Sequence, residues 1–378
     1  MALSIHGMRC PIMRICYYGT YDRDYCRNEI LRRGLGLAGA EVFECHEPVW
    51  QTQDKSQLRG VGEKLATGLR FVRSRRRLHL RYRDVPDHDV VLLGYLGHLD
   101  VGSAKRVAGA RPVIIDAFLS LYETVVEDRR MVGPGNPAAA LLKRLERRAY
   151  DRADLILLDT DAHIDYVADE FGIAREKFAR VFVGADDRLF RPPEAPVERG
   201  DTWDVLFYGK FIPLHGIEHI IRAAHILSGR AQVRLTLIGT GQTYSGARRL
   251  ADELRLTNIH WVDWVDYSQL PQRIASADVC LGVFASGGKA ARVIPNKVFQ
   301  CLACGAKVIS ADTPAMRELP PMGGNLHLVP AADAEAIAEA ILGACEDRCP
   351  PRRPAGLDQL LPIELGRGLL GRLEQIAR

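Results

Sequence analysis

The chain has 378 residues, of which 47% are hydrophobic and 26% are charged, a composition typical of a soluble globular protein. This length suits two domains, since about 150 residues per domain is the usual expectation. The formal net charge of +4 is too small to indicate a nucleic-acid-binding protein. No apolar run approaches the roughly 20 residues of a membrane span, and the first residues lack the apolar core of a signal peptide. We therefore expect a cytoplasmic protein.

The nine cysteines, without a small secreted framework, are expected to be reduced thiols. Cys301 and Cys304 could belong to a zinc site, but they fall in a predicted helix where small side chains are needed for packing. Asp22 and Asp24 resemble a metal-binding pair, but carboxylates at a helix start also favour the helix dipole. We expect no metal site and no cofactor.

Strands and helices alternate through the first half of the chain. Strands are predicted at residues 14–18, 41–45, 89–94, 112–116, 154–159 and 180–183, and helices at residues 24–38, 57–80, 137–152 and 161–171. This alternation is typical of a mainly parallel sheet with helices on both faces.

A proline-rich polar break at residues 191–200 separates the two halves, and the pattern then restarts. Strands are predicted at residues 204–208, 232–238, 258–262 and 279–284, and helices at residues 217–228, 267–275, 332–345 and 357–378. We predict an α/β protein with two doubly wound Rossmann-like domains, residues 13–192 and 201–350, that face each other across a cleft. The C-terminal helix, within residues 351–378, should pack back toward the first domain.

The most informative stretch is residues 277–313, which is predicted to form a strand, a basic glycine-rich loop, a short helix and a strand. Lys289 and Arg292 lie in the loop, and Asn296 opens the helix. Helix amides and nearby cations attract anions, and ligands of such sheets bind outside the carboxyl ends of the strands. These features favour a phosphate site over a loop with solvated side chains.

One face of this short helix carries polar and sulfur-containing side chains. Lys297, Gln300, Cys301 and Cys304 are spaced at i, i+3, i+4 and i+7, so they share a face. We expect that face to be free to meet a ligand. Neither half carries the complete NAD fingerprint. Only Gly19 follows the first strand, and in the second half Tyr244 stands where the third glycine after Gly239 and Gly241 belongs.

Four blocks of the second half carry a resemblance to a known family. They are residues 207–218 (FYGKFIPLHGIE), 237–241 (LIGTG), 277–279 (ADV) and 297–309 (KVFQCLACGAKVI). Together they resemble the retaining glycosyltransferases of the GT-B fold, glycosyltransferase family 4, also called glycosyl transferases group 1. The first half matches more loosely, at the turn of residues 18–22 and near Gly94 and Asp116.

The resemblance implies an enzyme that binds a nucleotide sugar in the cleft and transfers the sugar with retention of configuration. The diphosphate would be held by cations and helix amides without a metal, and the first domain would hold a sugar or lipid-linked acceptor. Donor contacts are expected from Gly19, Lys210, Gly239, Lys289, Arg292, Asn296, Lys297 and Gln300.

The chain departs from the family pattern at several positions. The usual Arg and Lys of the first block are Lys210 and His215, and the paired glutamates of the E-x7-E motif align with Arg292 and Gln300. The Gln300 amide can still bond ribose hydroxyls, whereas Arg292, with Lys289, is expected to grip the diphosphate.

In the first half, Asp116 stands where family members often carry a histidine. It is a candidate catalytic residue, with a structural cap at the strand end as the alternative. These departures also leave open a nucleotide-sugar epimerase of the same fold and a non-catalytic nucleotide-sugar-binding subunit.

The segment from Arg70 to Arg83 is basic and interleaved with apolar residues, and no acidic residue interrupts it. Its arginines are Arg70, Arg73, Arg75, Arg76, Arg77, Arg81 and Arg83. A segment of this kind can lie on an anionic membrane surface, here the inner face of the membrane, or hold an anionic acceptor. A solvated helix face is the alternative.

Overall fold

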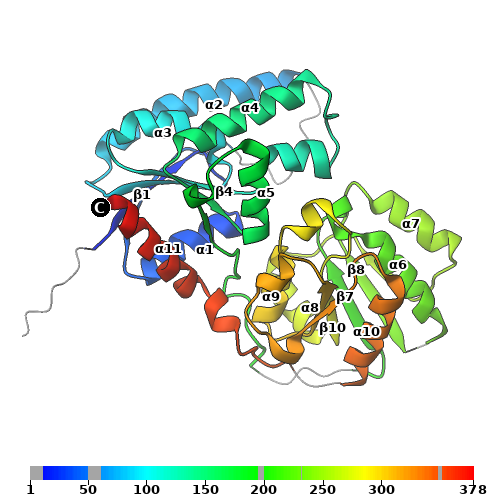
Figure 1. The fold of residues 1–378 in the computed structure, drawn as a ribbon. Coiled ribbons are helices and arrows are strands. Elements are labelled where there is room, and N and C mark those ends of the chain that lie inside the picture. Colours follow the sequence, from blue (N-terminus) through cyan, green and yellow to red (C-terminus); the bar gives the residue numbers. More distant parts are fainter. Residues whose placement is uncertain (1–11, 50–60, 195–199, 231, 348–350) are drawn as a thin grey trace, which may run out of the picture.

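The computed structural model describes residues 12–49, 61–194, 200–230, 232–347 and 351–378, and its described strands form two six-stranded sheets (Figure 1). The first sheet has the order β2-β1-β3-β4-β5-β6, and all of its paired strands are parallel. Its strands are β1 (Arg14–Gly19), β2 (Glu41–His46), β3 (Val90–Leu93), β4 (Val113–Phe118), β5 (Leu155–Leu158) and β6 (Phe178–Arg180).

Helices cover both faces of the first sheet. They are α1 (Cys26–Leu37), α2 (Val61–Arg81), α3 (Val101–Ala108), α4 (Pro137–Arg152) and α5 (Asp161–Phe171), and a π-helical turn spans Glu123–Asp128. In the central strand β3, Val90 and Leu92 belong to one core, while Val91 and Leu93 belong to the core on the other face. Burial on both faces explains why this strand is apolar throughout.

The second sheet repeats this architecture, with the order β12-β11-β10-β7-β8-β9 and parallel pairing. Its strands are β7 (Trp203–Tyr208), β8 (Val233–Ile238), β9 (Ile259–Val262), β10 (Val279–Leu281), β11 (Val308–Ala311) and β12 (Leu326–Val329). Its helices are α6 (Ile217–Ile226), α7 (Tyr244–Glu253), α8 (Leu270–Ser276), α9 (Asn296–Ala303) and α10 (Ala334–Glu346). The prediction of two doubly wound α/β domains is confirmed.

The last helix, α11 (Pro362–Ala377), packs against α1 of the first domain. Figure 1 shows α11 in red beside the blue α1. The two helices approach closely at glycines, because a Cβ atom on Gly34 would lie 2.2 Å from the carbonyl oxygen of Pro362. The end of the chain therefore returns to the first domain.

Some predicted elements differ from the structure. The strand predicted at residues 180–183 lies at Phe178–Arg180, and the one predicted at residues 279–284 ends at Leu281. The short elements α3 and β12 were not predicted, because an eight-residue helix with a Gly-Ser pair near its start and a four-residue strand carry little periodicity. Among the described helices, none is both long and apolar enough to cross a membrane.

Candidate active site

The candidate site lies at the carboxyl edge of the second sheet, where the loops after β7, β8 and β10 meet the start of α9. Gly209 and Lys210 follow β7, and Gly239 follows β8. Gly239 has a φ of 127°, and a Cβ atom there would lie 2.1 Å from the carbonyl oxygen of Gly209. Glycine is required at this contact, which brings the two loops together.

Helix α9 is buried over most of its length, so the face that was expected to be free is closed to solvent in this structure. Cys301 and Cys304 belong to the apolar core. The Oε1 atom of Gln300 accepts a hydrogen bond of 2.9 Å from the Tyr208 hydroxyl, and its Nε2 atom donates one of 2.9 Å to the Tyr267 hydroxyl. Gln300 is thus held by tyrosines in this structure.

Lys297, in the same helix, is buried without a hydrogen-bond partner for its Nζ atom among the described residues. The Nζ atom lies 3.7 Å from the centre of the Phe207 ring, and a Cβ atom on Gly209 would lie 3.3 Å from it. Burial lowers the pKa of Lys297 well below its usual range. A buried amine without a partner is costly, and an anion bound beside Gly209 would supply that partner.

His215 faces the same place from the loop after β7. It is buried, and its Nδ1 atom has no hydrogen-bond partner among the described residues. Burial, followed by the charge of Lys297, lowers the pKa of His215 well below its usual range, so the ring is neutral at pH 7. A neutral imidazole carries one N–H, and the hydrogen bond with the Lys210 backbone uses it, so the Nδ1 atom is left as an acceptor.

Arg129 is a cationic residue of the first domain that no sequence motif indicated. This residue follows the π-helical turn, and its Nε atom is buried without a hydrogen-bond partner among the described residues. Its charge adds to the effect of burial in lowering the pKa values of His215 and Lys289, so it lies near both. Arg129 and Lys297 each carry a buried nitrogen atom without a hydrogen-bond partner among the described residues, and the charges of both act on His215.

Lys289 and Arg292, which were expected to grip the diphosphate, are instead paired with the first domain. The Nη2 atom of Arg292 lies 2.7 Å from Glu123 Oε1, and Lys289 Nζ donates a hydrogen bond of 2.6 Å to Thr124 and lies 3.8 Å from Glu123 Oε2. Glu123 is fully buried. Both cations therefore have partners in the first domain in this structure.

Glu123 is the centre of a buried charge network. Its Oε2 atom lies 3.1 Å from Nε2 of His163, whose Nδ1 atom lies 2.8 Å from Asp159. Burial opposes ionisation of Glu123, but His163, Lys289 and Arg292 lower its pKa to about 2. Burial likewise opposes protonation of His163, but the two carboxylates raise its pKa to about 9. The network is thus ionised at neutral pH.

Further contacts join the two domains around the site. The Asn296 amide donates a hydrogen bond of 2.9 Å to the Cys26 sulfur at the start of α1, so this side chain bridges the domains. The Glu318 carboxylate accepts hydrogen bonds of 2.7 and 2.8 Å from the amides of Asp161 and Ala162 at the start of α5. Here the α5 N-terminus interacts with a carboxylate of the other domain.

Asp116 is fully buried in the first sheet, where it forms a bidentate pair with Arg27. Hydrogen bonds of 3.0 and 3.2 Å join the guanidinium to both carboxylate oxygens, and Arg27 also donates to the carbonyls of Val181 and Phe182. Burial raises the pKa of Asp116, and Arg27 opposes that rise. With neither partner exposed, the placement of Asp116 is that of a structural residue, not of one that contacts a substrate.

Gly19 ends β1, at the carboxyl edge of the first sheet. Its φ is 135°, and a Cβ atom there would lie 3.1 Å from the Asp100 carboxylate. That carboxylate accepts two hydrogen bonds of 2.8 Å from the amide and hydroxyl of Thr20. Gly19 thus allows the tight turn after β1, and no described contact joins it to Lys297.

A hollow of about 480 Å³ lies between the domains, beside the loop after β10. The first domain lines it with Glu127, Asp128 and Arg130, and the second lines it with residues that include Gly287, Lys289 and His219. This polar hollow is large enough for a sugar ring.

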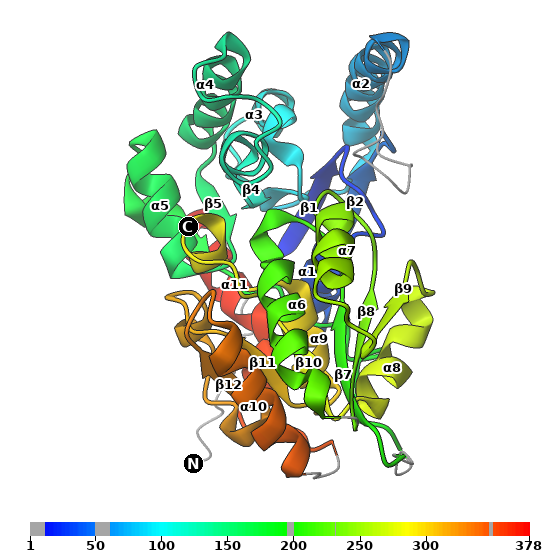
Figure 2. The same ribbon diagram turned by 90° about the vertical axis from the view of Figure 1, so that its right-hand side faces the viewer.

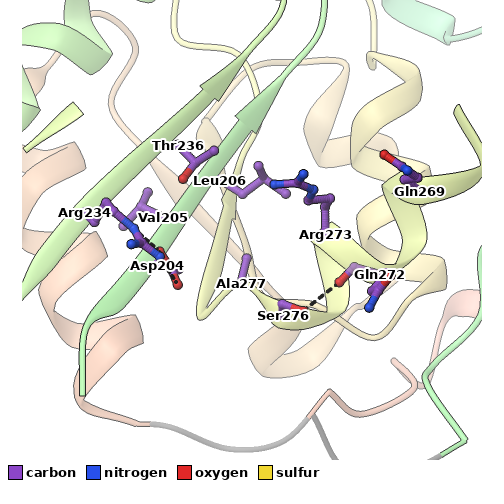
Figure 3. A pocket seen from close by; sticks show the side chains of 10 residues that line it. All are labelled: Asp204, Val205, Leu206, Arg234, Thr236, Gln269, Gln272, Arg273, Ser276 and Ala277. Atoms are coloured by element: carbon purple, nitrogen blue, oxygen red, sulfur yellow. Dashed lines mark hydrogen bonds and ion pairs between the residues drawn. The ribbon is translucent and has the colours of Figure 1, made fainter. Parts of the chain in front are cut away.

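A second hollow, of about 430 Å³, lies at the opposite edge of the second sheet, beside the amino ends of β7 and β8 and the end of α8 (Figure 3). Figure 3 shows the Asp204–Arg234 ion pair on one side and Arg273 reaching across from α8. None of the expected donor-binding residues lines it. Ligands of doubly wound sheets bind at the carboxyl edge, so this hollow is not the donor site.

Residues 202–347 match the family model described as glycosyl transferases group 1. The sucrose-phosphate synthase of Thermosynechococcus elongatus has a similar structure, with a TM-score of 0.64 and 17% identity over 97% of this chain and 96% of that one. The fold is GT-B. The Anabaena HepE complex with UDP-glucose is similar too, with a TM-score of 0.59 and 14% identity over 97% of each chain.

In sequence, the chain is similar to the MMP α-(1→4)-mannosyltransferase of Mycolicibacterium hassiacum. The two are 24% identical over 206 residues, which cover 54% of this chain and 48% of the relative. The chain therefore matches this relative over about half of the relative's length. Within the described part of the GT-B chain, no three His, Cys, Asp or Glu side chains form a group able to hold a metal ion.

Proposed function

We propose that this protein is a glycosyltransferase that moves a sugar from a nucleotide sugar to an acceptor hydroxyl with retention of configuration. The observation that carries the proposal is the buried amine of Lys297, which has no hydrogen-bond partner among the described residues and lies at the carboxyl edge of the domain that matches glycosyl transferases group 1. Arg129 adds a second buried nitrogen atom without a described partner, and its charge acts on His215, as the charge of Lys297 does. Two such cations suit the diphosphate of a nucleotide sugar.

The chemistry follows from where negative charge develops. As the bond between the anomeric carbon and the phosphate oxygen breaks, charge grows on the departing nucleoside diphosphate. Preorganised donors stabilise a transition state where its charge forms, and Lys297 and Arg129 are suited to that role. The acceptor oxygen forms the new bond on the same face of the sugar, and its proton passes to a phosphate oxygen. No protein nucleophile takes part.

The sugar of the donor is assigned to the hollow between the domains. Glu127 and Asp128 can accept hydrogen bonds from sugar hydroxyls there, and His219 faces them from α6. The mannosyltransferase relative and the UDP-glucose complex of HepE support a hexosyl donor. The first domain would then hold the acceptor, a sugar or a lipid-linked glycan.

The test is a panel of UDP-, GDP-, ADP- and dTDP-sugars, with the melting temperature of the purified protein as the readout. A ligand at 100 times its dissociation constant should stabilise the protein by about 2.7 kcal/mol. The stabilising donor is then incubated with candidate acceptors, and NMR spectroscopy assigns the anomeric configuration of the product. Transfer with retention supports the proposal. Inversion at C2 with release of free nucleotide would identify an epimerase, and binding without turnover would identify a non-catalytic subunit.

A further inference from the structure

Helices α2, α3 and α4 form one layer over the first sheet, on the face opposite to α1 and α11. Figures 1 and 2 both place α2 and α4 on the outer side of this domain, and α3 packs against each of them. Their inner faces are buried in one core through Leu78, Ala104, Ala149 and Tyr150. Their outer faces are left to solvent.

The outer face of α2 combines arginines with exposed aliphatic side chains. Val72 is 54% exposed and Leu80 is 58% exposed, and Arg76 is an exposed residue between them. The three are spaced at i, i+4 and i+8, so they share one side of the helix. Arg73 and Arg83 flank this row, and none of these three arginines forms an ion pair with a described residue.

Helix α4 repeats the same combination. Leu141 is 58% exposed and Leu145 is 40% exposed, and the exposed Arg144 and Arg148 alternate with them at i, i+3, i+4 and i+7. Of the two acidic residues in this helix, Glu146 is buried and the other lies close to the end. The outward side of α4 is therefore positively charged and partly aliphatic.

Three arginines of the basic segment in α2 have partners within the protein. Arg81 lies 2.9 Å and Arg77 lies 3.7 Å from the Glu47 carboxylate, and Arg75 is partly buried with its guanidinium over the Phe71 ring. The contacts with Glu47 hold α2 to the domain, whereas Arg75 and Phe71 are both in α2. Arg73, Arg76, Arg144 and Arg148 are exposed and form no ion pair with a described residue, so an external anion can reach them.

We propose that the outer faces of α2 and α4 form a docking surface for an anionic lipid bilayer. The α2–α4 surface is defined by Val72, Arg73, Arg76, Leu80, Leu141, Arg144, Leu145 and Arg148. Arginines attract the phosphates of acidic headgroups, and exposed aliphatic side chains can enter the boundary between headgroups and acyl chains. A nucleic acid offers phosphates but no such apolar layer, so the four aliphatic side chains favour a bilayer. This docking is independent of the glycosyl transfer proposed above.

Co-sedimentation of the full chain with vesicles tests the surface. One vesicle preparation contains equal amounts of phosphatidylcholine and phosphatidylglycerol, and the other contains phosphatidylcholine alone. We expect binding to the anionic vesicles only, with affinity that falls as salt rises. Arg73→Ser with Arg76→Ser should lower the partition coefficient about tenfold or more. Arg222→Ser with Arg249→Ser, which removes two exposed arginines of the second domain, is the matched control and should leave it unchanged.

A second double variant, Leu80→Ser with Leu141→Ser, distinguishes binding to a bilayer from binding to other polyanions. It keeps every charge and should still weaken vesicle binding. All of these positions are exposed, and unchanged melting temperatures will verify that the variants fold. The proposal is overturned if the protein does not bind anionic vesicles at low salt, or if both double variants bind as tightly as the parent. Binding to single-stranded RNA that needs the arginines but not the leucines, without vesicle binding, would assign the surface to nucleic acid.

Discussion

The Nη2 atom of Arg292 in the second domain lies 2.7 Å from the Oε1 atom of Glu123 in the first. Arg292 occupies the position where the resemblance to family 4 glycosyltransferases implies a glutamate. The charge at this position is therefore reversed, and a carboxylate of the other domain accompanies it. The Arg292 guanidinium also lies 3.7 Å from the centre of the Tyr166 ring, which belongs to the first domain as well. This arginine connects the domains.

Removal of the Glu123 charge should destabilise the protein strongly. Glu123→Gln would leave His163, Lys289 and Arg292 without their shared carboxylate, and loss of one partner of a buried ion pair costs about 3–5 kcal/mol. Chemical denaturation or the melting temperature would measure the loss. Glu127→Gln is the control, because this carboxylate is 38% exposed and lies 3.4 Å from Arg292. It should cost less than about 1 kcal/mol, and equal effects would contradict a central role for Glu123.

Stability should depend on pH through the same network. His163 has a folded-state pKa of about 9, above the roughly 6.5 of an unfolded chain. Its contribution to the free energy of unfolding is therefore complete below about pH 6.5 and is lost as the pH rises through 9. Glu123 has a folded-state pKa of about 2, below an unfolded value near 4.3. Its contribution is present above about pH 4.3 and is lost as the pH falls toward 2.

Melting temperatures recorded across this pH range will test the predicted loss of stability at alkaline pH. In the parent protein we expect a plateau from about pH 4.5 to 6.5 and a decline from there toward pH 9. The His163→Gln variant should have a lower melting temperature than the parent at neutral pH. Above about pH 6.5 its melting temperature should fall less than that of the parent, because no histidine loses its proton at this position. An identical alkaline decline in the two proteins would show that another group causes it.

The sequence predicted the fold well because two-sided burial leaves a strong pattern. The apolar run of β3 and the caps of α4 and α5 are local signals, and both helices have the predicted bounds. The site was harder to predict, because the partners of its charged side chains are distant in the sequence. Arg292 and Glu123 are 169 residues apart, and no local pattern shows that one neutralises the other. Arg129 likewise reaches the site only through the arrangement of the domains.

Lys297→Met should affect stability and ligand binding in opposite directions. The methionine keeps the aliphatic volume and removes a buried amine that has no described partner, so the free protein should be at least as stable as the parent. Affinity for UDP or GDP should fall about tenfold to a hundredfold, because a charge-assisted hydrogen bond contributes roughly 1.5–3 kcal/mol. Thermal unfolding and titration calorimetry measure the two effects.

Lys307→Met provides the control for this substitution. Lys307 precedes β11, at the opposite edge of the sheet, where its Nζ atom donates a hydrogen bond of 3.0 Å to the Ala344 carbonyl. Its replacement should leave nucleotide affinity unchanged. If Lys297→Met binds nucleotide as tightly as the parent, the diphosphate does not lie beside Gly209.

Activity should survive an excess of EDTA. The proposed mechanism assigns the charge of the departing diphosphate to Lys297 and Arg129, so no divalent cation is needed to stabilise it. Sugar transfer measured with and without chelator will check this expectation. Full loss of activity, restored by magnesium or manganese, would contradict a metal-independent mechanism. Asp22 and Asp24, just before α1, would then be the candidate metal ligands.

Arg129→Met should lower turnover more than it weakens binding of the nucleotide sugar. Negative charge on the diphosphate is greater in the transition state than in the bound donor, so a cation aimed there stabilises the transition state preferentially. Loss of one such donor typically lowers kcat by about 10²–10³-fold. The measurements are kcat with saturating acceptor and the Kd of the intact donor, with Arg249→Met as a charge-matched control in the exposed part of α7. Equal loss in kcat/KM and donor affinity, with kcat unchanged, would make Arg129 a residue for ground-state binding only. No change in either would remove it from the site, while Lys297→Met would still test the diphosphate position independently.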